Sequence, residues 1–281
     1  MAREQNDYYK NKAKNYHNRD DNKENKKDDD KETDYSMEED RISGRNAVLE
    51  ALKAHTTINK ILITKEKEDG SLGQIIAIAR ENNLIIQEVD REALDKISGT
   101  RAHQGVMAYL AARDYSTVED ILQIAKDRNE PPFILILDEV QDPNNFGAII
   151  RTANAVGVHG IIIPKRRSVA LTPTVAKVSA GAIEYMAVAR VSNLASTMEE
   201  LKKEGVWIAG TDLSGETPFF GADLKGSIAL VVGSEGYGIG RLVKEKCDYV
   251  LSIPMKGEVS SLNASVAAGV VLYEIFRQRA R

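Results

Sequence analysis

Three polar loops, each placed directly after a run of apolar residues, hold the side chains best suited to chemistry in this sequence. They cover residues 138–145, 233–240 and 256–263, and each is rich in Gly, Asn, Ser or acidic residues. In an open α/β sheet, ligands bind beyond the carboxyl ends of the strands, where loops of this kind gather. The three loops therefore predict a site in the second half of the chain.

The glycine-rich loop 233–240 indicates a pocket that differs from the common phosphate-binding loops. It lacks the Lys-Ser or Lys-Thr ending of a P-loop, and its glycines do not follow the G-x-G-x-x-G spacing. Its first charged residue is Glu235, which is unfavourable beside a pyrophosphate but suits a cationic group, ribose hydroxyls or backbone amides. Considered alone, such a loop is more often a structural turn than a binding site.

Arg151 and the polar residues before the last helix are the other candidates. Arg151 lies among apolar and small residues of an expected helix, so it is either a solvated cation or a functional group. Ser260, Ser261 and Asn263 either cap the helix that follows them or orient a ligand. The four His residues form no pair or triad with suitable neighbours, so we expect no metal site.

Length and composition are typical of a globular protein with room for two domains. The chain has 281 residues, of which 42% are hydrophobic and 28% are charged. No apolar run approaches the ~18–20 residues that cross a bilayer, and we find no signal-peptide pattern. The single Cys247 excludes an internal disulfide, and we expect it to pack as a small apolar side chain. These features favour the cytoplasm and no membrane.

Residues 1–40 differ in composition from the rest of the chain. They contain 9 basic and 13 acidic residues but no Leu, Ile, Val, Phe or Trp, which predicts a disordered charged tail. The formal net charge of the whole chain is −4, and the remaining residues carry 29 basic and 29 acidic side chains. A neutral body can still have a basic face, so composition neither predicts nor excludes a nucleic-acid partner.

Residues 41–112 have alternating helical and strand patterns, which predict a small N-terminal α/β domain. Helices are expected at 43–52, 72–82 and 91–97, and strands at 60–64, 84–89 and 106–110. The loop with Arg101, His103 and Gln104 before the last strand either contacts RNA or is a plain turn. Residues 113–132 form a linker with a leading helix at 117–126.

Residues 133–281 are expected to form a second α/β domain. Strands are expected at 133–137, 160–164, 187–191, 206–211, 228–233 and 249–254. Helices are expected at 146–157, 171–179, 194–204, 241–246 and 264–279. Because strands and helices alternate, the sheet should be mainly parallel.

The three loops carry recognisable motifs. The first is Asp142-Pro-Asn-Asn-Phe-Gly-Ala-Ile-Ile-Arg-Thr-Ala153, and the second is Leu230-Val-Val-Gly-Ser-Glu-Gly-Tyr-Gly238. The third is Ile253-Pro-Met255 followed by Ser260-Ser-Leu-Asn-Ala-Ser-Val-Ala267. In order and spacing they resemble the motifs of the SpoU/TrmH family of RNA ribose 2′-O-methyltransferases. The stretch 44–52 resembles the start of that family's N-terminal substrate-binding domain, which is similar to small RNA-binding ribosomal proteins.

The resemblance implies a trefoil knot in the C-terminal half, a homodimer formed through the catalytic domain, and S-adenosylmethionine as cofactor. The site residues that match the family's motifs by position, together with residues that lie next to them, divide into three groups. The cofactor group comprises Gly210, Thr211, Gly233, Ser234, Gly236, Ile253, Met255 and Leu262. The catalytic group comprises Arg151 with Asn145, Glu235, Ser261 and Asn263, which would orient Arg151, the ribose and the loop. The RNA group comprises Arg45, Arg101, His103, Gln104 and Arg151.

The implied reaction is an in-line transfer of a methyl group to a ribose 2′-hydroxyl. Arg151 would lie beside that hydroxyl and the adjacent phosphate. Because Arg normally stays protonated, anchoring the phosphate is a safer role for it than that of general base.

The ordered chain most resembles the family member that methylates a guanosine in the peptidyltransferase loop of large-subunit ribosomal RNA. A transfer RNA target is an alternative, as is a non-catalytic RNA-binding factor in ribosome assembly. The intact Asn145, Arg151, Glu235 and Asn263 disfavour the non-catalytic factor. An NAD enzyme is disfavoured because the G-x-G-x-x-G pattern is missing after its first strand.

Overall fold

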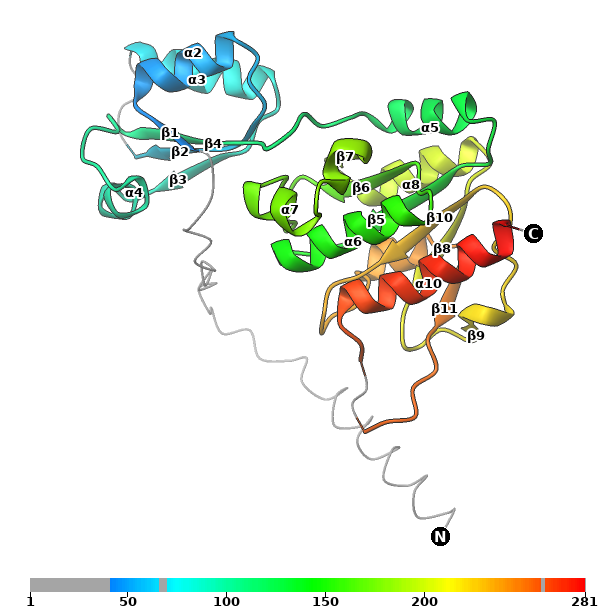
Figure 1. The fold of residues 1–281 in the computed structure, drawn as a ribbon. Coiled ribbons are helices and arrows are strands. Elements are labelled where there is room, and N and C mark those ends of the chain that lie inside the picture. The colour runs from blue at the N-terminus through cyan, green and yellow to red at the C-terminus, as the bar shows by residue number, and fades with distance from the viewer. Residues whose placement is uncertain (1–40, 66–69, 259–260, 281) are drawn as a thin grey trace. The chain divides into compact units, whose positions relative to one another are not determined.

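The computed structural model describes residues 41–65, 70–258 and 261–280 (Figure 1). The expectations for residues 1–40 and for Ser260 lie outside the described residues. Within those ranges, no helix is long and apolar enough to span a membrane.

A four-stranded sheet forms the N-terminal part, with strand order β1-β4-β2-β3. Its strands are β1 (Arg41–Ser43), β2 (Ile58–Thr64), β3 (Ile86–Val89) and β4 (Val106–Leu110). Three helices accompany them: α2 (Arg45–Lys53), α3 (Gly70–Glu81) and α4 (Arg91–Ser98). Only the β2–β3 pair is parallel, so this sheet is mixed.

Alternation along β2 separates the two faces of this sheet. Ile61 and Ile63 pack with α2 and α3 on one face, while Leu62 packs with Leu94 of α4 on the other. The apolar residues of the sequence pattern therefore form both layers of this core.

A seven-stranded sheet forms the second part, with strand order β7-β6-β5-β10-β8-β11-β9. Its strands are β5 (Phe133–Leu137), β6 (Gly160–Pro164), β7 (Ala187–Val191), β8 (Trp207–Thr211), β9 (Thr217–Pro218), β10 (Ile228–Val232) and β11 (Tyr249–Ser252). Every pairing in it is parallel, as the alternation of strands and helices predicts.

Helices cover both faces of the seven-stranded sheet (Figure 1). Residues of α6 (Pro143–Ala155), α7 (Pro173–Val178) and α10 (Ala264–Arg279) pack on the face that holds Leu135. Residues of α5 (Val118–Asp127), α8 (Leu194–Lys203) and α9 (Arg241–Glu245) pack on the face that holds Ile134. Strands buried on both faces explain the continuous apolar runs in the sequence.

The structure corrects several expected element boundaries. Helix α6 begins at Pro143, three residues before the expected start, because Asp142 is its N-cap and Pro favours the first helical position. Helix α2 begins only at Arg45 because Gly44 has a positive φ of 98°. Strands β1 and β9, and 3₁₀ turns at 182–185 and 219–221, were not expected from the sequence.

Candidate functional site

A cavity of about 470 Å³ lies at the carboxyl ends of β10, β8 and β11. It is lined by 211–213, 232–238, Ile253, Met255 and, from the start of α10, Ser261, Leu262, Ala264 and Ala267. We call it the glycine-loop cavity. All predicted cofactor residues except Gly210 lie on its wall, together with Glu235 and Ser261 of the predicted catalytic group. Its volume lies within the range that is usual for small-molecule sites.

Backbone geometry explains the glycines of the loop 233–240. Ser234 N donates to Gly238 O, and Gly238 N donates to Ser234 O, each at 3.0 Å. Gly236 and Gly238 have positive φ values of 93° and 66°, which L side chains rarely adopt. A Cβ on Gly233 would lie 2.1 Å from the backbone of Gly238, so no side chain fits there. The loop is therefore a closed backbone turn that leaves its inner wall open to a ligand.

Glu235 joins three distant segments of the chain. Its Oε1 accepts from Asn145 Nδ2 at 3.0 Å, from Asn263 Nδ2 at 2.5 Å and from the backbone N of Ala264 at 3.0 Å. Asn263 Nδ2 also lies 2.8 Å from Asn145 Oδ1. The first turn of α6, the glycine-rich loop and the N-terminus of α10 are thus held together. The negative charge of Glu235 also lies at the N-terminus of α10, where the positive end of the helix dipole attracts it.

The caps of the two helices leave Asn145 and Asn263 with different tasks. Asp142 caps α6 by accepting from the backbone N of Asn144 and Asn145, which leaves the Asn145 side chain for Glu235. Asn263 caps α10 through Oδ1, which accepts from Ser265 N and Val266 N, and uses its amide NH₂ for the contact with Glu235. Capping and ligand orientation are therefore not exclusive alternatives for Asn263.

Arg151 lies outside the Glu235 network. It is exposed on α6, and no hydrogen bond or ion pair joins it to another described residue. It follows Asn145 by six residues, which is about 9 Å along the helix axis. No hydrogen bond joins Arg151 to Asn145, Glu235, Ser261 or Asn263, so the expectation that these residues orient Arg151 stays a prediction. Among the described residues, Arg151 is an exposed cation of α6 without an ion-pair partner.

Two further residues differ from their expected surroundings. Gly210 lies behind the cavity, because a Cβ there would be 2.8 Å from Cys247 Sγ and 3.1 Å from Ile239. Thr211 lines the cavity, but its hydroxyl donates its only proton to Val231 O at 3.0 Å. The hydroxyl can therefore act only as a hydrogen-bond acceptor toward a ligand. Burial raises the pKa of the Cys247 thiol to about 11, which fits the expected packing role.

The RNA candidates of the N-terminal part divide into exposed and buried groups. Arg45 donates from Nε to the carbonyl of Gln104, and Gln104 Oε1 accepts from Arg45 N. Arg101 is exposed. His103 is fully buried, with Nε2 2.7 Å from Asp95 and Nδ1 accepting from Gly105 N. His103 therefore holds the loop, whereas Arg101 is open to solvent.

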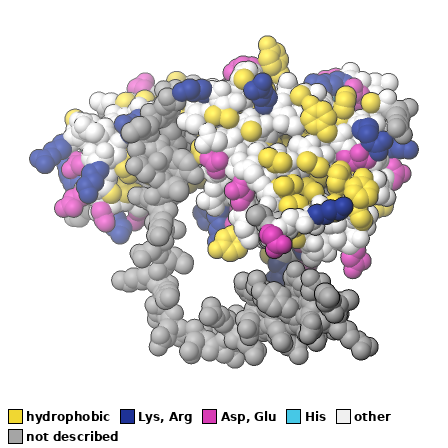
Figure 2. Space-filling view, turned by 60° about the horizontal axis from the view of Figure 1, so that its bottom comes forward, with side chains coloured by type: hydrophobic (Ala, Val, Ile, Leu, Met, Phe, Trp, Pro, Cys, Tyr) yellow, Lys and Arg dark blue, Asp and Glu magenta, His cyan; other side chains and the backbone are white. Residues whose placement is uncertain are grey.

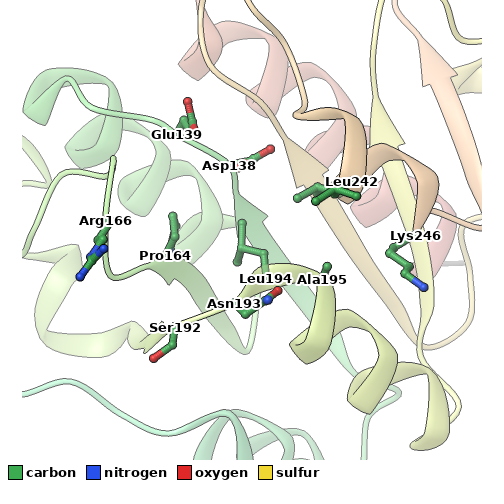
Figure 3. A pocket seen from close by; sticks show the side chains of 11 residues that line it. Asp138, Glu139, Pro164, Arg166, Ser192, Asn193, Leu194, Ala195, Leu242 and Lys246 are labelled. Carbon is green, nitrogen blue, oxygen red and sulfur yellow. The ribbon is translucent and has the colours of Figure 1, made fainter. Parts of the chain in front are cut away.

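A second hollow, a cleft of about 290 Å³, lies beyond the carboxyl ends of β5, β6 and β7 (Figure 3). Asp138 lies on its wall, and Asp138 Oδ2 accepts from Gly240 N at 2.8 Å. Arg166 and Lys246 lie on opposite sides of it in Figure 3. Burial raises the pKa of Asp138, against the lowering effect of the Gly240 hydrogen bond. We call this hollow the β6–β7 cleft.

Seven residues that line the glycine-loop cavity are not among the predicted site residues: Asp212, Leu213, Val232, Tyr237, Gly238, Ala264 and Ala267. Asp212 and Leu213 directly follow the predicted Thr211, so the end of β8 was the available signal. A metal site is not found, because the described residues hold no suitable group of His, Cys, Asp and Glu.

An open parallel sheet with a glycine-loop cavity at its carboxyl edge defines an α/β protein that binds a small ligand at that edge. Solved structures share this fold. The SpoU methyltransferase AviRb of Streptomyces viridochromogenes, solved with its cofactor AdoMet, matches with a TM-score of 0.55 at 24% identity, over 86% of this chain and 91% of AviRb. The AdoMet-bound rRNA methyltransferase of Sinorhizobium meliloti matches with a TM-score of 0.52 at 23% identity, over 85% of this chain and 87% of that methyltransferase.

Sequence relatives are closer. YacO of Bacillus subtilis (strain 168), whose name places it among the TrmH family tRNA/rRNA methyltransferases, is 51% identical over 87% of this chain and 98% of YacO. A protein of the same description from Staphylococcus saprophyticus is 49% identical over 86% of this chain and 97% of that protein. The SpoU rRNA methylase family matches residues 132–273, and the RNA 2′-O ribose methyltransferase substrate-binding family matches residues 41–116. The chain belongs to the SpoU rRNA methylase family of RNA methyltransferases.

Proposed function

We propose that the protein transfers a methyl group from S-adenosylmethionine to a ribose 2′-hydroxyl of large-subunit ribosomal RNA, at a guanosine of the peptidyltransferase loop. The observation that carries this proposal is the glycine-loop cavity, which is locked to the first turns of α6 and α10 by Glu235. All three motifs of the family meet at this point of the fold.

The residues of the cavity fit S-adenosylmethionine. Ile253, Met255 and Leu262 provide an apolar wall for an adenine ring. Where Gly233 closely approaches Gly238, the glycine-rich loop has no room for a side chain, so a ligand there would meet the backbone. Among the described residues, no Lys or Arg lines the cavity, which suits a cofactor without phosphate groups. The cofactor would supply an activated methyl group on its sulfonium.

The protein's part in the reaction is to hold the RNA and to deal with the proton of the 2′-hydroxyl. We assign Arg151 to the phosphate beside the target ribose, because it is exposed, charged and free of any described partner. Asn145, Glu235 and Asn263 hold the loop and both helices, so they act by positioning. Ser261 is exposed on the cavity wall, where its hydroxyl can reach the ribose.

A transfer RNA target is the second candidate, because the names of the bacterial relatives cover both tRNA and rRNA. The match of residues 41–116 to a substrate-binding family favours a target that needs a separate RNA-binding domain. We propose residues 41–112 as that domain, 113–132 as the linker with α5, and 133–281 as the catalytic domain.

The test of the target is tritium transfer from labelled S-adenosylmethionine to unmodified large-subunit rRNA and to bulk tRNA, side by side, followed by site mapping. We expect label at one ribose of the peptidyltransferase loop. Label only in tRNA would keep the chemistry and overturn the target. No label in either RNA or in pre-ribosomal particles, with cofactor binding intact, would support a non-catalytic assembly factor.

We also propose a homodimer formed through the catalytic domain. Figure 2 shows hydrophobic side chains gathered on one face of the molecule. On α10, Val266, Val270, Tyr273 and Phe276 are 50%, 36%, 54% and 44% exposed, and their spacing places them on one side of the helix. An apolar helix side of this kind suits a second copy of the chain.

Light scattering of the purified protein tests the dimer. We expect a dimer mass for the wild type and a monomer mass for Tyr273→Asp. Tyr185→Asp is the matched control, because Tyr185 is 79% exposed but belongs to the 3₁₀ turn Ala182–Tyr185 and not to α10. A monomeric wild type would overturn the dimer.

The trefoil knot and the cytoplasmic location remain parts of this proposal. Strands β10 and β11 lie on either side of β8, so the connection between them crosses β8, and the proposed knot requires the chain after this crossing to thread through a loop. An experimental trace of residues 207–279 without a threaded loop would contradict the knot. Fractionation of cells that express the protein tests the location, and recovery with the membranes would contradict it.

A further inference from the structure

Asp212 and Glu235 are the charged residues among those described on the wall of the glycine-loop cavity, and each accepts its hydrogen bonds on one carboxylate oxygen only. Glu235 uses its bonds to join α6 to α10, whereas Asp212 bonds to its own loop and to α9. Asp212 follows the last residue of β8, and its side chain is 18% exposed. Oδ1 accepts from Ser214 N at 2.9 Å and from Ser214 Oγ at 2.7 Å, and it lies 2.9 Å from Lys244 Nζ. Three donors therefore fix the orientation of this carboxylate.

Asp212 Oδ2 accepts no hydrogen bond from a described residue. It lies close to Gly238, because a Cβ built on that glycine would be 3.3 Å away from it. Asp212 and Gly238 both line the cavity. The free oxygen therefore lies at the wall of the cavity, beside a residue without a side chain to cover it.

The carboxylate is ionised at neutral pH. Burial raises the pKa of Asp212, but the hydrogen bonds from Ser214 and the interaction with Lys244 outweigh burial and lower the pKa overall. A charged acceptor that is held in place forms stronger hydrogen bonds than a neutral one. It also repels phosphate groups, in keeping with a cavity whose described wall residues include no Lys or Arg.

We propose that Asp212 Oδ2 binds the cofactor directly and accepts a hydrogen bond from one of its polar donors, either a ribose hydroxyl or the α-ammonium group. This inference rests on the proposed use of S-adenosylmethionine. Ser214 and Lys244 are positioning residues, since they occupy Oδ1 and leave Oδ2 for the ligand. Asp212 is thereby a specificity residue, because it favours a nucleoside with hydroxyl or cationic donors over a nucleotide.

Calorimetric titration with S-adenosylmethionine, without RNA, tests the inference on the full chain. Asp212→Asn keeps the size of the side chain and removes its charge. We expect its dissociation constant to rise about tenfold or more, the usual effect of losing a hydrogen bond to a charged group.

Asp248→Asn is the matched control. Asp248 is 22% exposed and also pairs with a lysine, since Asp248 Oδ1 lies 2.8 Å from Lys202 Nζ. Its Oδ2 accepts from Ile208 N at 2.8 Å, so both of its oxygens are used by the protein, and it lies outside the cavity. We expect Asp248→Asn to change thermal stability but to leave the dissociation constant within about twofold of the wild type.

A second ligand separates the two donors. 5′-Methylthioadenosine keeps the ribose hydroxyls but lacks the amino-acid group of the cofactor. If Asp212→Asn weakens both ligands equally, the donor is a ribose hydroxyl. If it weakens S-adenosylmethionine alone, the donor is the ammonium group.

Equal affinity of the wild type and a folded Asp212→Asn for both ligands would overturn the inference and leave the proposed function intact. An equal loss in Asp212→Asn and Asp248→Asn would also overturn it, because the effect would then be structural. A wild type that binds no S-adenosylmethionine would instead overturn the proposed function itself.

Discussion

The two hollows at the carboxyl edge of the seven-stranded sheet differ in how their polar atoms are satisfied. In the β6–β7 cleft, three of the four charged wall residues pair within the protein: Asp138 accepts from Gly240 N, Glu139 pairs with Arg167, and Lys246 pairs with Glu199 at 3.0 Å. Arg166 makes no hydrogen bond or ion pair with another described residue. In the glycine-loop cavity, Asp212 keeps one free oxygen, and the wall opposite the loop is apolar. Most charged groups of the β6–β7 cleft are therefore paired within the protein, whereas the glycine-loop cavity offers a free carboxylate oxygen and an apolar wall to a ligand.

This difference shows that charge alone is a poor guide to a site on this edge. The β6–β7 cleft has more charged residues on its wall, with Asp138, Glu139, Arg166 and Lys246. The glycine-loop cavity combines close backbone approach, an apolar wall and a carboxylate with a free oxygen. We therefore expect substitutions in the β6–β7 cleft to change stability, and substitutions in the glycine-loop cavity to change binding or catalysis.

Arg151→Ala should have the largest effect. We expect methyl transfer to fall about a hundredfold to a thousandfold, because the cation that we assign to the phosphate beside the target ribose is lost. Affinity for S-adenosylmethionine should stay within about threefold, since Arg151 does not line the cavity. Arg167→Ala, which removes an exposed cation paired with Glu139 beside the cleft, is the control and should keep its activity. Loss of cofactor binding in a folded Arg151→Ala would contradict the assignment.

Gly233→Ala should rank second. Its Cβ would lie 2.1 Å from the Gly238 backbone, which has no freedom to yield without opening the loop. We expect cofactor affinity, measured by calorimetry, to fall about tenfold to a hundredfold, with overpacking costing about 1–3 kcal/mol. Gly226→Ala is the control, because nothing lies within 4 Å of the added Cβ there. Unchanged affinity in Gly233→Ala would show that the loop does not shape the site.

Asn263→Ala should have an intermediate effect on two properties. Loss of the α10 cap should cost about 1 kcal/mol of unfolding free energy, measured by denaturant titration. Methyl transfer should fall as well, because the contact of Asn263 with Glu235 is lost. Asn193→Ala removes the cap of α8, which accepts from Ser196 N, and it should lower stability alone. Equal activities of the two variants would argue against a positioning role for Asn263.

Asp138→Asn should have the smallest effect, confined to the pH dependence of stability. Burial raises the folded-state pKa of Asp138, so its favourable contribution is full below the unfolded pKa of about 3.9 and is lost as pH rises through the folded value. Asn can still accept from Gly240 N without a buried charge. Thermal melts at pH 4 and pH 7.5 should show the variant gaining stability relative to the wild type at the higher pH. A relative loss there would mean that the charge itself stabilises the cleft.

Most of the fold could be predicted from the sequence because its signals are local. The run at 133–137 is buried at every position, so a short apolar stretch was enough to place β5. Strands β1 and β9 have three and two residues, which is too short for any periodicity. The start of α6 depends on Asp142 and Pro143, whose capping signal is stronger than that of Asn145.

The site was predictable only where a motif names the residue. The link between Asn145, Glu235 and Asn263 depends on loops that meet in space, so spacing indicated the residues but not their bonds. His103 could be either an RNA contact or part of a plain turn on sequence grounds, because its partner Asp95 belongs to α4 and no local pattern connects the two. The free oxygen of Asp212 depends on Lys244 of α9, a contact that no local pattern reveals.

The most direct test of the central claim is a crystal structure of the protein grown with S-adenosylmethionine. We predict density for the cofactor in the glycine-loop cavity, with its adenine beside Ile253 and Leu262. Density in the β6–β7 cleft, or an empty glycine-loop cavity at a cofactor concentration that saturates binding in solution, would contradict the account.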